Sequence, residues 1–345
     1  MKKKIIISVA CVLAMIIVVV TFVALMTPLL MPKSAEDGLT GEYYEQAGGN
    51  DVIFLGDCEV YETFVPAVLW EKYGITSYVR GSPQQLIWQS YYILEETFKY
   101  EKPKAVVFNV YSMKYGTPQN EKNNRMTLDS MKWSTSKIDA INASMTEDES
   151  FIEYLVPFFA YHSRITDLNE NDFKYWFTDK ERASDSGYLM RTEVKPMVQG
   201  VPMEPYEGFE FSQTAFDYLD KMKDLCKENG AELILVKAPT NSWRFYWFEE
   251  YEKQIEDYAN ENGLKYYNLI EHEEEIGLDW NIHTYDEGLH LNVYGAEMTT
   301  EYFGGFLAEE CNVPDRRSDE SMAKKWADNL SIYKQRKIKL EENKK

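Results

Sequence analysis

The chain has 345 residues, of which 44% are hydrophobic and 14% aromatic, enough for one large packed domain or two smaller ones. Its formal net charge of −20 argues against nucleic acid as a partner, because phosphate binding requires a basic face. The sequence has no CxxC motif and no close Cys/His cluster, so we expect neither a structural metal nor a cofactor.

The N-terminus predicts a membrane anchor. Three lysines at positions 2–4 precede an uncharged apolar run over residues 5–31. A bilayer core needs about 20 apolar residues, whereas a cleavable signal has an apolar region of only about 7 to 15. The run therefore favours an uncleaved single-pass anchor in the cell membrane. The positive-inside rule places the lysines in the cytoplasm and the remaining chain outside.

This topology determines the environment expected for each of the four cysteines. Cys11 falls in the apolar run, and Cys58, Cys226 and Cys311 fall in the extracytoplasmic part. Three cysteines in a compartment that can be oxidising allow one disulfide and one free thiol. The spacing does not assign the pair.

After a polar linker (32–49), short apolar strands alternate with longer amphipathic helices across a domain at 50–315. This alternation predicts an α/β fold, a three-layer α/β/α sandwich with a parallel, flavodoxin-like sheet. The expected strands are 51–56, 75–81, 104–111, 231–239 and 264–270, and the expected helices are 63–74, 84–100, 214–230, 251–263 and 295–310.

Two segments do not follow this alternation of strands and helices. Residues 112–211 are rich in Asn, Asp, Ser and aromatic residues, with helical patterns near 127–142 and 149–165, and we expect an insertion that caps the sheet edge. Residues 316–345 carry many charges at helical spacing, which predicts a charged helical tail.

Cys58 follows Gly56-Asp57 at the end of the first expected strand. A nucleophile on such a turn is exposed, and nearby backbone N–H groups can hold a developing oxyanion. Cys58 is therefore either a reactive thiol or a small inert residue of the turn.

Asp286 and His290 share a loop before the last expected helix, which Asn292 is placed to cap. A general base needs an imidazole oriented by a carboxylate, and this pair supplies both groups. Asp279 and His283 have the same spacing and remain an alternative pair. A polar capping loop without catalytic function is the other interpretation.

Together these stretches resemble the SGNH (GDSL-type) hydrolase and acyltransferase superfamily. Its first block, Gly-Asp-Ser after the first strand, is matched with Cys58 in place of the serine. Its last block, usually Asp-x-x-His, is matched by Asp286 and His290 with one residue more between them. The oxyanion glycine of its second block is matched by Gly81. Its third block, Gly-x-Asn-Asp, is matched only by Asn109.

The resemblance covers residues 51–111 and 212–311. With its apolar N-terminus, the chain is also similar to membrane-anchored proteins of teichoic-acid D-alanylation and to anchored O-acetyltransferase-like proteins. The resemblance implies a membrane-bound esterase or acyltransferase that acts on acyl esters of a cell-surface polymer or carbohydrate. A membrane acyltransferase is a further candidate partner. The alternative is a catalytically inactive SGNH-fold module that binds the polymer.

In the implied site, Cys58 attacks the acyl carbonyl, His290 takes its proton and Asp286 holds the imidazole. The resemblance assigns the oxyanion to the N–H groups of Cys58 and Gly81 and to the Asn109 side chain. Lys237 and Arg244, after the fourth strand, are either contacts to an anionic polymer or ordinary surface charges.

Overall fold

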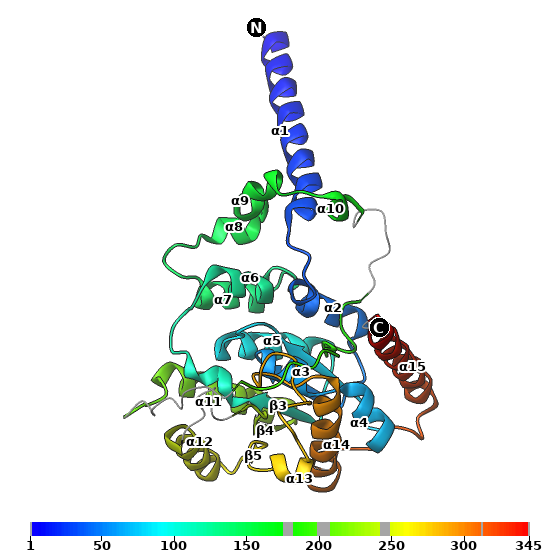
Figure 1. Cartoon of the computed structure of the whole chain (residues 1–345). Coiled ribbons are helices and arrows are strands. Elements are labelled where there is room, and N and C mark those ends of the chain that lie inside the picture. The colour runs from blue at the N-terminus through cyan, green and yellow to red at the C-terminus, as the bar shows by residue number, and fades with distance from the viewer. Residues whose placement is uncertain (1, 175–181, 199–207, 242–248, 312, 344–345) are drawn as a thin grey trace. The chain divides into compact units, whose positions relative to one another are not determined.

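The computed structural model describes residues 2–174, 182–198, 208–241, 249–311 and 313–343 (Figure 1). The chain forms two compact units, one made of residues 1–34 and 147–181 and the other of residues 35–146 and 182–345. The expected insertion at 112–211 is thus divided between the two units. The site described below lies entirely within the larger one.

A five-stranded sheet forms the centre of the larger unit, with the strand order β2-β1-β3-β4-β5. All neighbouring strands are parallel, and Gly56 of β1 pairs with Gly81 of β2. The prediction of a parallel, flavodoxin-like sheet is confirmed. The strands are β1 (Val52–Gly56), β2 (Ser77–Gly81), β3 (Ala105–Asn109), β4 (Glu232–Lys237) and β5 (Lys265–Asn268).

Helices cover both faces of this sheet, which confirms the three-layer sandwich. Ile53 and Leu55 of β1 pack into one core, and Val52 and Phe54 pack into the core on the opposite face. Helices α5 (Ile87–Tyr100), α11 (Gln213–Asn229) and α12 (Glu249–Asn262) contribute to the first core. Helices α4 (Pro66–Tyr73) and α14 (Val293–Glu310) contribute to the second (Figure 1).

A short helix, α3 (Cys58–Thr63), follows β1 directly, where the sequence analysis expects helix only from residue 63. It begins at Cys58 because the Asp57 side chain accepts a hydrogen bond from the backbone N–H of Glu59 (3.2 Å). Helix α4 begins at Pro66, and Val65 interrupts the helix before it, because the residue before a proline favours an extended backbone. Cys58 is thus the first residue of a helix.

The expected apolar helix at the N-terminus is confirmed as α1 (Lys2–Leu30), with a mean hydropathy of 3.1 over its most apolar window. It is long and apolar enough to cross a membrane, a property that some signal sequences share. The smaller unit also contains α8 (Phe151–Leu155), α9 (Phe158–Tyr161), the 3₁₀ helix η3 (His162–Thr166) and α10 (Glu170–Lys174).

Much of the expected linker, residues 32–49, folds onto the larger unit. It forms the 3₁₀ helix η1 (Glu36–Gly38) and helix α2 (Leu39–Gln46). Leu39 and Tyr43, one turn apart, are both buried, and the Arg80 guanidinium lies 3.8 Å above the centre of the Tyr43 ring. Apolar residues at this spacing make the segment part of the core.

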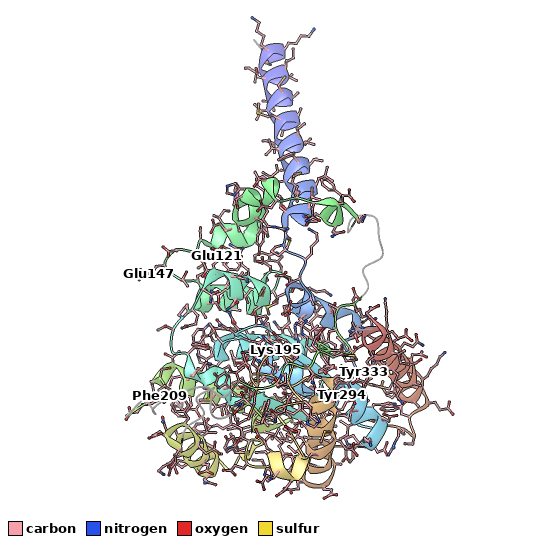
Figure 2. The ribbon with its side chains drawn as sticks, in the orientation of Figure 1. Glu121, Glu147, Lys195, Phe209, Tyr294 and Tyr333 are labelled. Atoms are coloured by element: carbon pink, nitrogen blue, oxygen red, sulfur yellow. The ribbon has the colours of Figure 1, made fainter. Side chains whose placement is uncertain are left out.

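The larger unit also contains several shorter elements. Helices α6 (Glu121–Leu128), α7 (Thr135–Ser144) and α13 (Glu273–Ile276) and the 3₁₀ helix η2 (Val110–Lys114) belong to it. The charged tail forms α15 (Glu320–Glu342). Its Trp326 stacks on Trp70 of α4 (5.9 Å between ring centres), and Tyr333, labelled in Figure 2, donates to Glu297 of α14 (2.6 Å). The tail is thus held against α4 and α14.

Candidate active site

Cys58 lies at the carboxyl end of β1, on the sharp turn into α3. The turn depends on Gly56, whose φ of 148° is a conformation that residues with a side chain rarely adopt. A Cβ atom at this position would also come within 2.9 Å of the Asn109 Cβ. The half-buried thiol therefore stands where parallel α/β sheets commonly form their sites.

His290 and Asp286 reach Cys58 from the loop before α14. The His290 Nδ1 lies 2.6 Å from Asp286 Oδ2, and the His290 backbone N–H donates to Asp286 Oδ1 (2.8 Å). His290 also lies beside Cys58, where it opposes the rise in the pKa of the thiol that burial causes. Since Nδ1 faces the two carboxylates of Asp286 and Glu62, Nε2 is the nitrogen that remains available to the thiol. The three groups thus form a Cys-His-Asp arrangement.

The loop accommodates the extra residue between Asp286 and His290 because two of its residues adopt a left-handed backbone conformation. Glu287 has a φ of 68° and Gly288 a φ of 100°, so the chain turns back tightly after Asp286. Asn292 then caps α14 as predicted, accepting hydrogen bonds from the backbone N–H groups of Tyr294 (3.2 Å) and Gly295 (3.3 Å). The unusual spacing therefore still brings the carboxylate to the imidazole.

The alternative pair, Asp279 and His283, lies elsewhere. The His283 Nδ1 accepts the backbone N–H of Asp279 (3.0 Å), and the exposed Asp279 carboxylate accepts from the backbone and side chain of Asn281. Both residues are thus occupied within their own turn. The structure brings Asp286 and His290 to the thiol, and not this pair.

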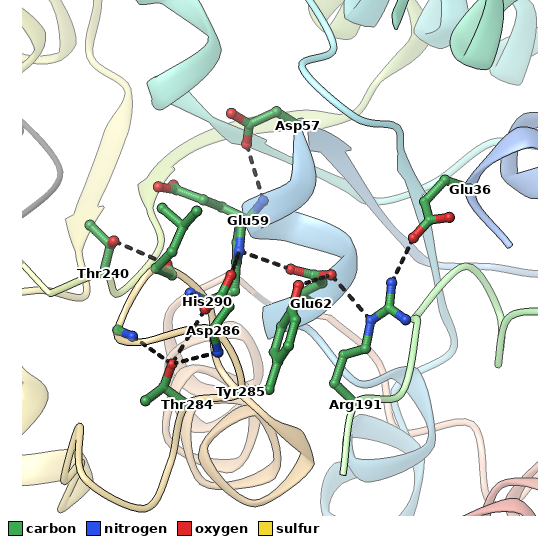
Figure 3. A network of polar contacts seen from close by, with 12 residues as sticks. Glu36, Asp57, Glu59, Glu62, Arg191, Thr240, Thr284, Tyr285, Asp286 and His290 are labelled. Carbon is green, nitrogen blue, oxygen red and sulfur yellow. Dashed lines mark hydrogen bonds and ion pairs between the residues drawn. The ribbon is translucent and has the colours of Figure 1, made fainter. Parts of the chain in front are cut away.

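Glu62 is a second carboxylate on His290 that the sequence analysis misses. It belongs to α3, one turn after Cys58, and its Oε2 lies 3.3 Å from His290 Nδ1. The Tyr285 hydroxyl donates to Glu62 Oε1 (2.7 Å). Arg191 lies 3.6 Å from Glu62 Oε1 and donates to Glu36 (2.6 Å), so a charged network runs from η1 to the imidazole (Figure 3).

The electrostatics of the site follow from burial and these carboxylates. Burial raises the pKa of the Cys58 thiol, and the nearby His290 opposes this rise. Burial by itself lowers the pKa of His290, but Glu62, Cys58 and the hydrogen bond to Asp286 outweigh it, and the pKa lies well above its usual value. Burial also raises the pKa of Glu62, against the opposing effect of His290. The imidazole is therefore a strong proton acceptor beside a half-buried thiol.

Beneath Cys58, Asn109 and Lys237 form a buried cluster with Glu59. The Asn109 Nδ2 donates to Asp57 (3.2 Å) and to Glu59 (2.8 Å), so its amide protons face these carboxylates. The Lys237 side chain is 0% exposed and donates to both Glu59 carboxylate oxygens at 2.9 Å. Lys237 is thus an internal charge in contact with Glu59, and not a surface charge. Arg244, the other predicted polymer contact, lies outside the described residues.

Gly81 and Lys114 adjoin the Cys58 turn. A Cβ on Gly81 would approach Val60 Cγ2 to 2.6 Å and the Asp57 carbonyl oxygen to 3.1 Å, so β2 and α3 pack closely there. Lys114 is a further residue that the sequence analysis misses, and its Nζ lies 3.4 Å above the centre of the Tyr111 ring. Burial lowers the pKa of Lys114, while Asp57 and Glu59 oppose that change.

All four cysteines carry free thiols, so Cys58 is not in a disulfide. Cys226 lies buried in α11, and Cys311 is buried after α14. Across the described parts of the chain, no group of three or more His, Cys, Asp and Glu side chains is arranged to hold a metal ion.

Comparison with known proteins gives nine matching chains among solved structures, including the following two. One is a GDSL-like lipase from Bacteroides thetaiotaomicron, with 13% identity, a TM-score of 0.36, and coverage of 80% of this chain and 98% of the lipase. The other is a putative acylhydrolase from Bacteroides fragilis, with 12% identity, a TM-score of 0.37, and coverage of 82% and 98%. No family model and no curated protein sequence matches the chain. The chain is therefore similar to these two proteins at a low level, and its chemistry is inferred from the site itself.

Proposed function

We propose that the chain is an SGNH-like esterase or acyltransferase that uses Cys58, His290 and Asp286, and that α1 anchors it in a membrane. The observation that supports this most directly is His290, whose Nδ1 contacts the Asp286 carboxylate and whose proximity opposes the rise in the pKa of the Cys58 thiol. An imidazole held between a carboxylate and a potential nucleophile has the geometry that acyl transfer requires.

In the proposed reaction, the Cys58 sulfur attacks the acyl carbonyl carbon while the thiol proton moves to His290. The tetrahedral oxyanion accepts hydrogen bonds from the backbone N–H groups of Cys58 and Gly81. The intermediate collapses to a thioester, and His290 returns the proton to the departing alkoxide. An incoming hydroxyl then attacks the thioester and gives its proton to His290, which passes it to the sulfur as the thiol re-forms.

The acceptor decides between hydrolysis and transfer. Water as acceptor makes the protein an esterase, and a hydroxyl of a glycan or polyol makes it a transferase. A thioester exchanges readily with hydroxyl groups, which favours transfer. An acylated cell-surface polymer is the substrate class that fits an enzyme anchored with its large unit outside the membrane, and a membrane acyltransferase is then a candidate donor partner.

Lys237 is buried in an ion pair with Glu59, so we do not include it in the proposed substrate-binding site. For the same reason we leave the Asn109 amide out of the oxyanion site, since its protons face Asp57 and Glu59. The proposed oxyanion site therefore consists of backbone groups. It depends on the close packing of α3 against Gly81.

The test uses the full chain purified in detergent. We expect iodoacetamide to modify Cys58 at neutral pH in the wild type, and much more slowly in His290→Ala. Turnover of p-nitrophenyl acetate is expected in the wild type and not in Cys58→Ala, with Cys58→Ser measuring how far oxygen replaces sulfur. Equal turnover by Cys58→Ala rejects Cys58 as the nucleophile. An unreactive Cys58 together with no turnover in the wild type also rejects it and favours an inactive module that binds polymer.

A further inference from the structure

The smaller unit combines α1 with a group of short helices that expose apolar side chains. Helix α9 packs against α1, with the rings of Phe158 and Phe22 in an edge-to-face contact at 6.0 Å between their centres. Phe22 precedes the end of α1 at Leu30 by eight residues. At a rise of about 1.5 Å per residue, this contact lies about 12 Å before the end of the helix.

The length of α1 places this contact at the edge of a bilayer core. The apolar run begins at Ile5, and about 20 helical residues cross a core of roughly 30 Å, so the hydrocarbon ends near Leu25. Phe22, and with it Phe158, then lies at the boundary between hydrocarbon and headgroups. This inference rests on the proposed membrane anchoring of α1.

A charged layer follows at the end of the helix, where headgroups are expected. Arg164 donates to the Leu30 carbonyl oxygen (2.5 Å), and Lys33 donates to the Leu29 carbonyl oxygen (2.9 Å). Both cations also contact Asp172, at 3.3 Å and 2.9 Å respectively. Cations at a helix C-terminus interact favourably with the helix dipole. Here they surround the end of α1 with charged side chains.

The helices beside this boundary expose large apolar side chains. Four residues between positions 151 and 166 have exposed fractions near one half: Ile152 (49%), Leu155 (52%), Phe159 (49%) and Ile165 (54%). So many exposed apolar residues in one short segment mark a surface that another apolar phase covers. Because α9 contacts α1 at the hydrocarbon boundary, lipid chains are the phase available there.

We propose that residues 151–166 are an interfacial membrane element that lies in the bilayer surface beside α1, with lipid acyl chains covering Ile152, Leu155, Phe159 and Ile165. Short amphipathic helices bind this region by burying their apolar face at the boundary between headgroups and acyl chains. The smaller unit would then hold the membrane at two places, through α1 and through this element.

The test uses the full chain in nanodiscs of phosphatidylcholine and phosphatidylglycerol. A genetically encoded fluorescent amino acid replaces one residue at a time, at Phe159, Leu155, Val18 of α1, or Ile332 of α15. Ile332 is the matched control, since it is apolar and as exposed as Phe159 (49%) but belongs to the larger unit. Lipids with nitroxide-labelled acyl chains quench a probe in the bilayer, and iodide quenches a probe in water.

We expect nitroxide lipid to quench the probes at Val18, Phe159 and Leu155, and iodide to quench the probe at Ile332. If Val18 is quenched by lipid while Phe159 and Leu155 are quenched by iodide, the anchor stands and the interfacial element is rejected. If Phe159 and Leu155 are shielded from both quenchers, protein covers them and the lipid proposal is also overturned. If Val18 itself escapes lipid quenching, the proposed anchoring fails first.

Discussion

Glu62 and His290 lie 3.3 Å apart, from Glu62 Oε2 to His290 Nδ1, on the same nitrogen that contacts Asp286. One imidazole therefore faces two carboxylates, one from its own loop and one from the helix that begins with Cys58. Two negative groups stabilise the imidazolium more than one does, which is why the pKa of His290 is raised despite burial. Glu62 is thus a positioning residue that acts through His290.

The first prediction concerns the pH dependence of Cys58. Burial raises the pKa of the thiol, and Glu62 adds to this rise while it also raises the pKa of His290. Glu62→Gln removes the charge, so both pKa values fall and the rate of iodoacetamide modification should rise at a lower pH than in the wild type. Mass spectrometry of Cys58 across pH measures the shift.

Tyr285→Phe is the control for this variant, since it removes a hydrogen bond to Glu62 and leaves the charge in place. Tyr285→Phe should shift the pH profile of Cys58 modification much less than Glu62→Gln does. A Glu62→Gln profile that coincides with the wild type would show that Glu62 only fills space.

The second prediction concerns the buried pair beneath the site. Lys237→Met leaves the Glu59 carboxylate buried without its cation, which should cost about 3–5 kcal/mol in the free energy of unfolding. Denaturant unfolding of the full chain in detergent measures the loss. Glu59→Gln with Lys237→Met should recover part of it. Lys253→Met, at an exposed pair with Asp257, should cost about 0–1 kcal/mol, and a similar cost at Lys237 would contradict the prediction.

The third prediction concerns the packing of α3 on β2. Gly81→Ala places a Cβ 2.6 Å from Val60 Cγ2 and 3.1 Å from the Asp57 carbonyl oxygen, so α3 must shift. A displaced nucleophile should slow ester turnover about tenfold or more. Val60→Ala in the same chain relieves the closest contact and should restore part of the rate. Gly305→Ala is the control, because its Cβ would meet only the Tyr73 hydroxyl at 3.5 Å, and equal losses in both variants would refute the prediction.

The fourth prediction concerns Asp57. Burial and the neighbouring Glu59 raise its pKa from 3.8 to about 6. A carboxyl whose pKa is raised by folding destabilises the fold increasingly as pH rises from about 4 through 6, because the unfolded state ionises more readily. Asp57→Asn keeps an oxygen to accept the Glu59 N–H. It should stabilise the fold at pH 7.5 by roughly 1–3 kcal/mol and much less near pH 4.

Thermal unfolding of the wild type and of Asp57→Asn at both pH values measures this difference. A stability change that is the same at pH 4 and pH 7.5 would show that the Asp57 charge does not contribute.

The parallel sheet was predictable because apolar runs of five or six residues alternate with helical patterns, and local sequence carries that signal. The two carboxylates that face His290 differ in whether the sequence reveals them. Asp286 is visible from its spacing to His290, whereas Glu62 becomes visible only if α3 is seen to begin at Cys58. With the helix expected from residue 63, the spacing of one turn between Cys58 and Glu62 carried no meaning.

Lys237 shows what sequence reasoning could not supply. A lysine at the end of an apolar strand is consistent with a surface or substrate contact, and its actual partner, Glu59, is far away in the chain. Only the sheet order, which places β4 beside β3 and close to the β1 turn, reveals the pair. The membership of residues 147–181 in the unit of α1 is likewise a long-range contact without a local pattern.

The ion pair between Glu36 and Arg191 has a practical consequence for where the chain can be shortened. A soluble form that starts at residue 40, within the expected linker at 32–49, would discard Glu36 and the buried Leu39. Arg191 would then have lost its ion pair with Glu36 and would interact more strongly with Glu62. The interaction of Glu62 with His290 would be weaker as a result. A form that starts at residue 35 keeps this charge balance, and the two lengths should therefore differ in the reactivity of Cys58.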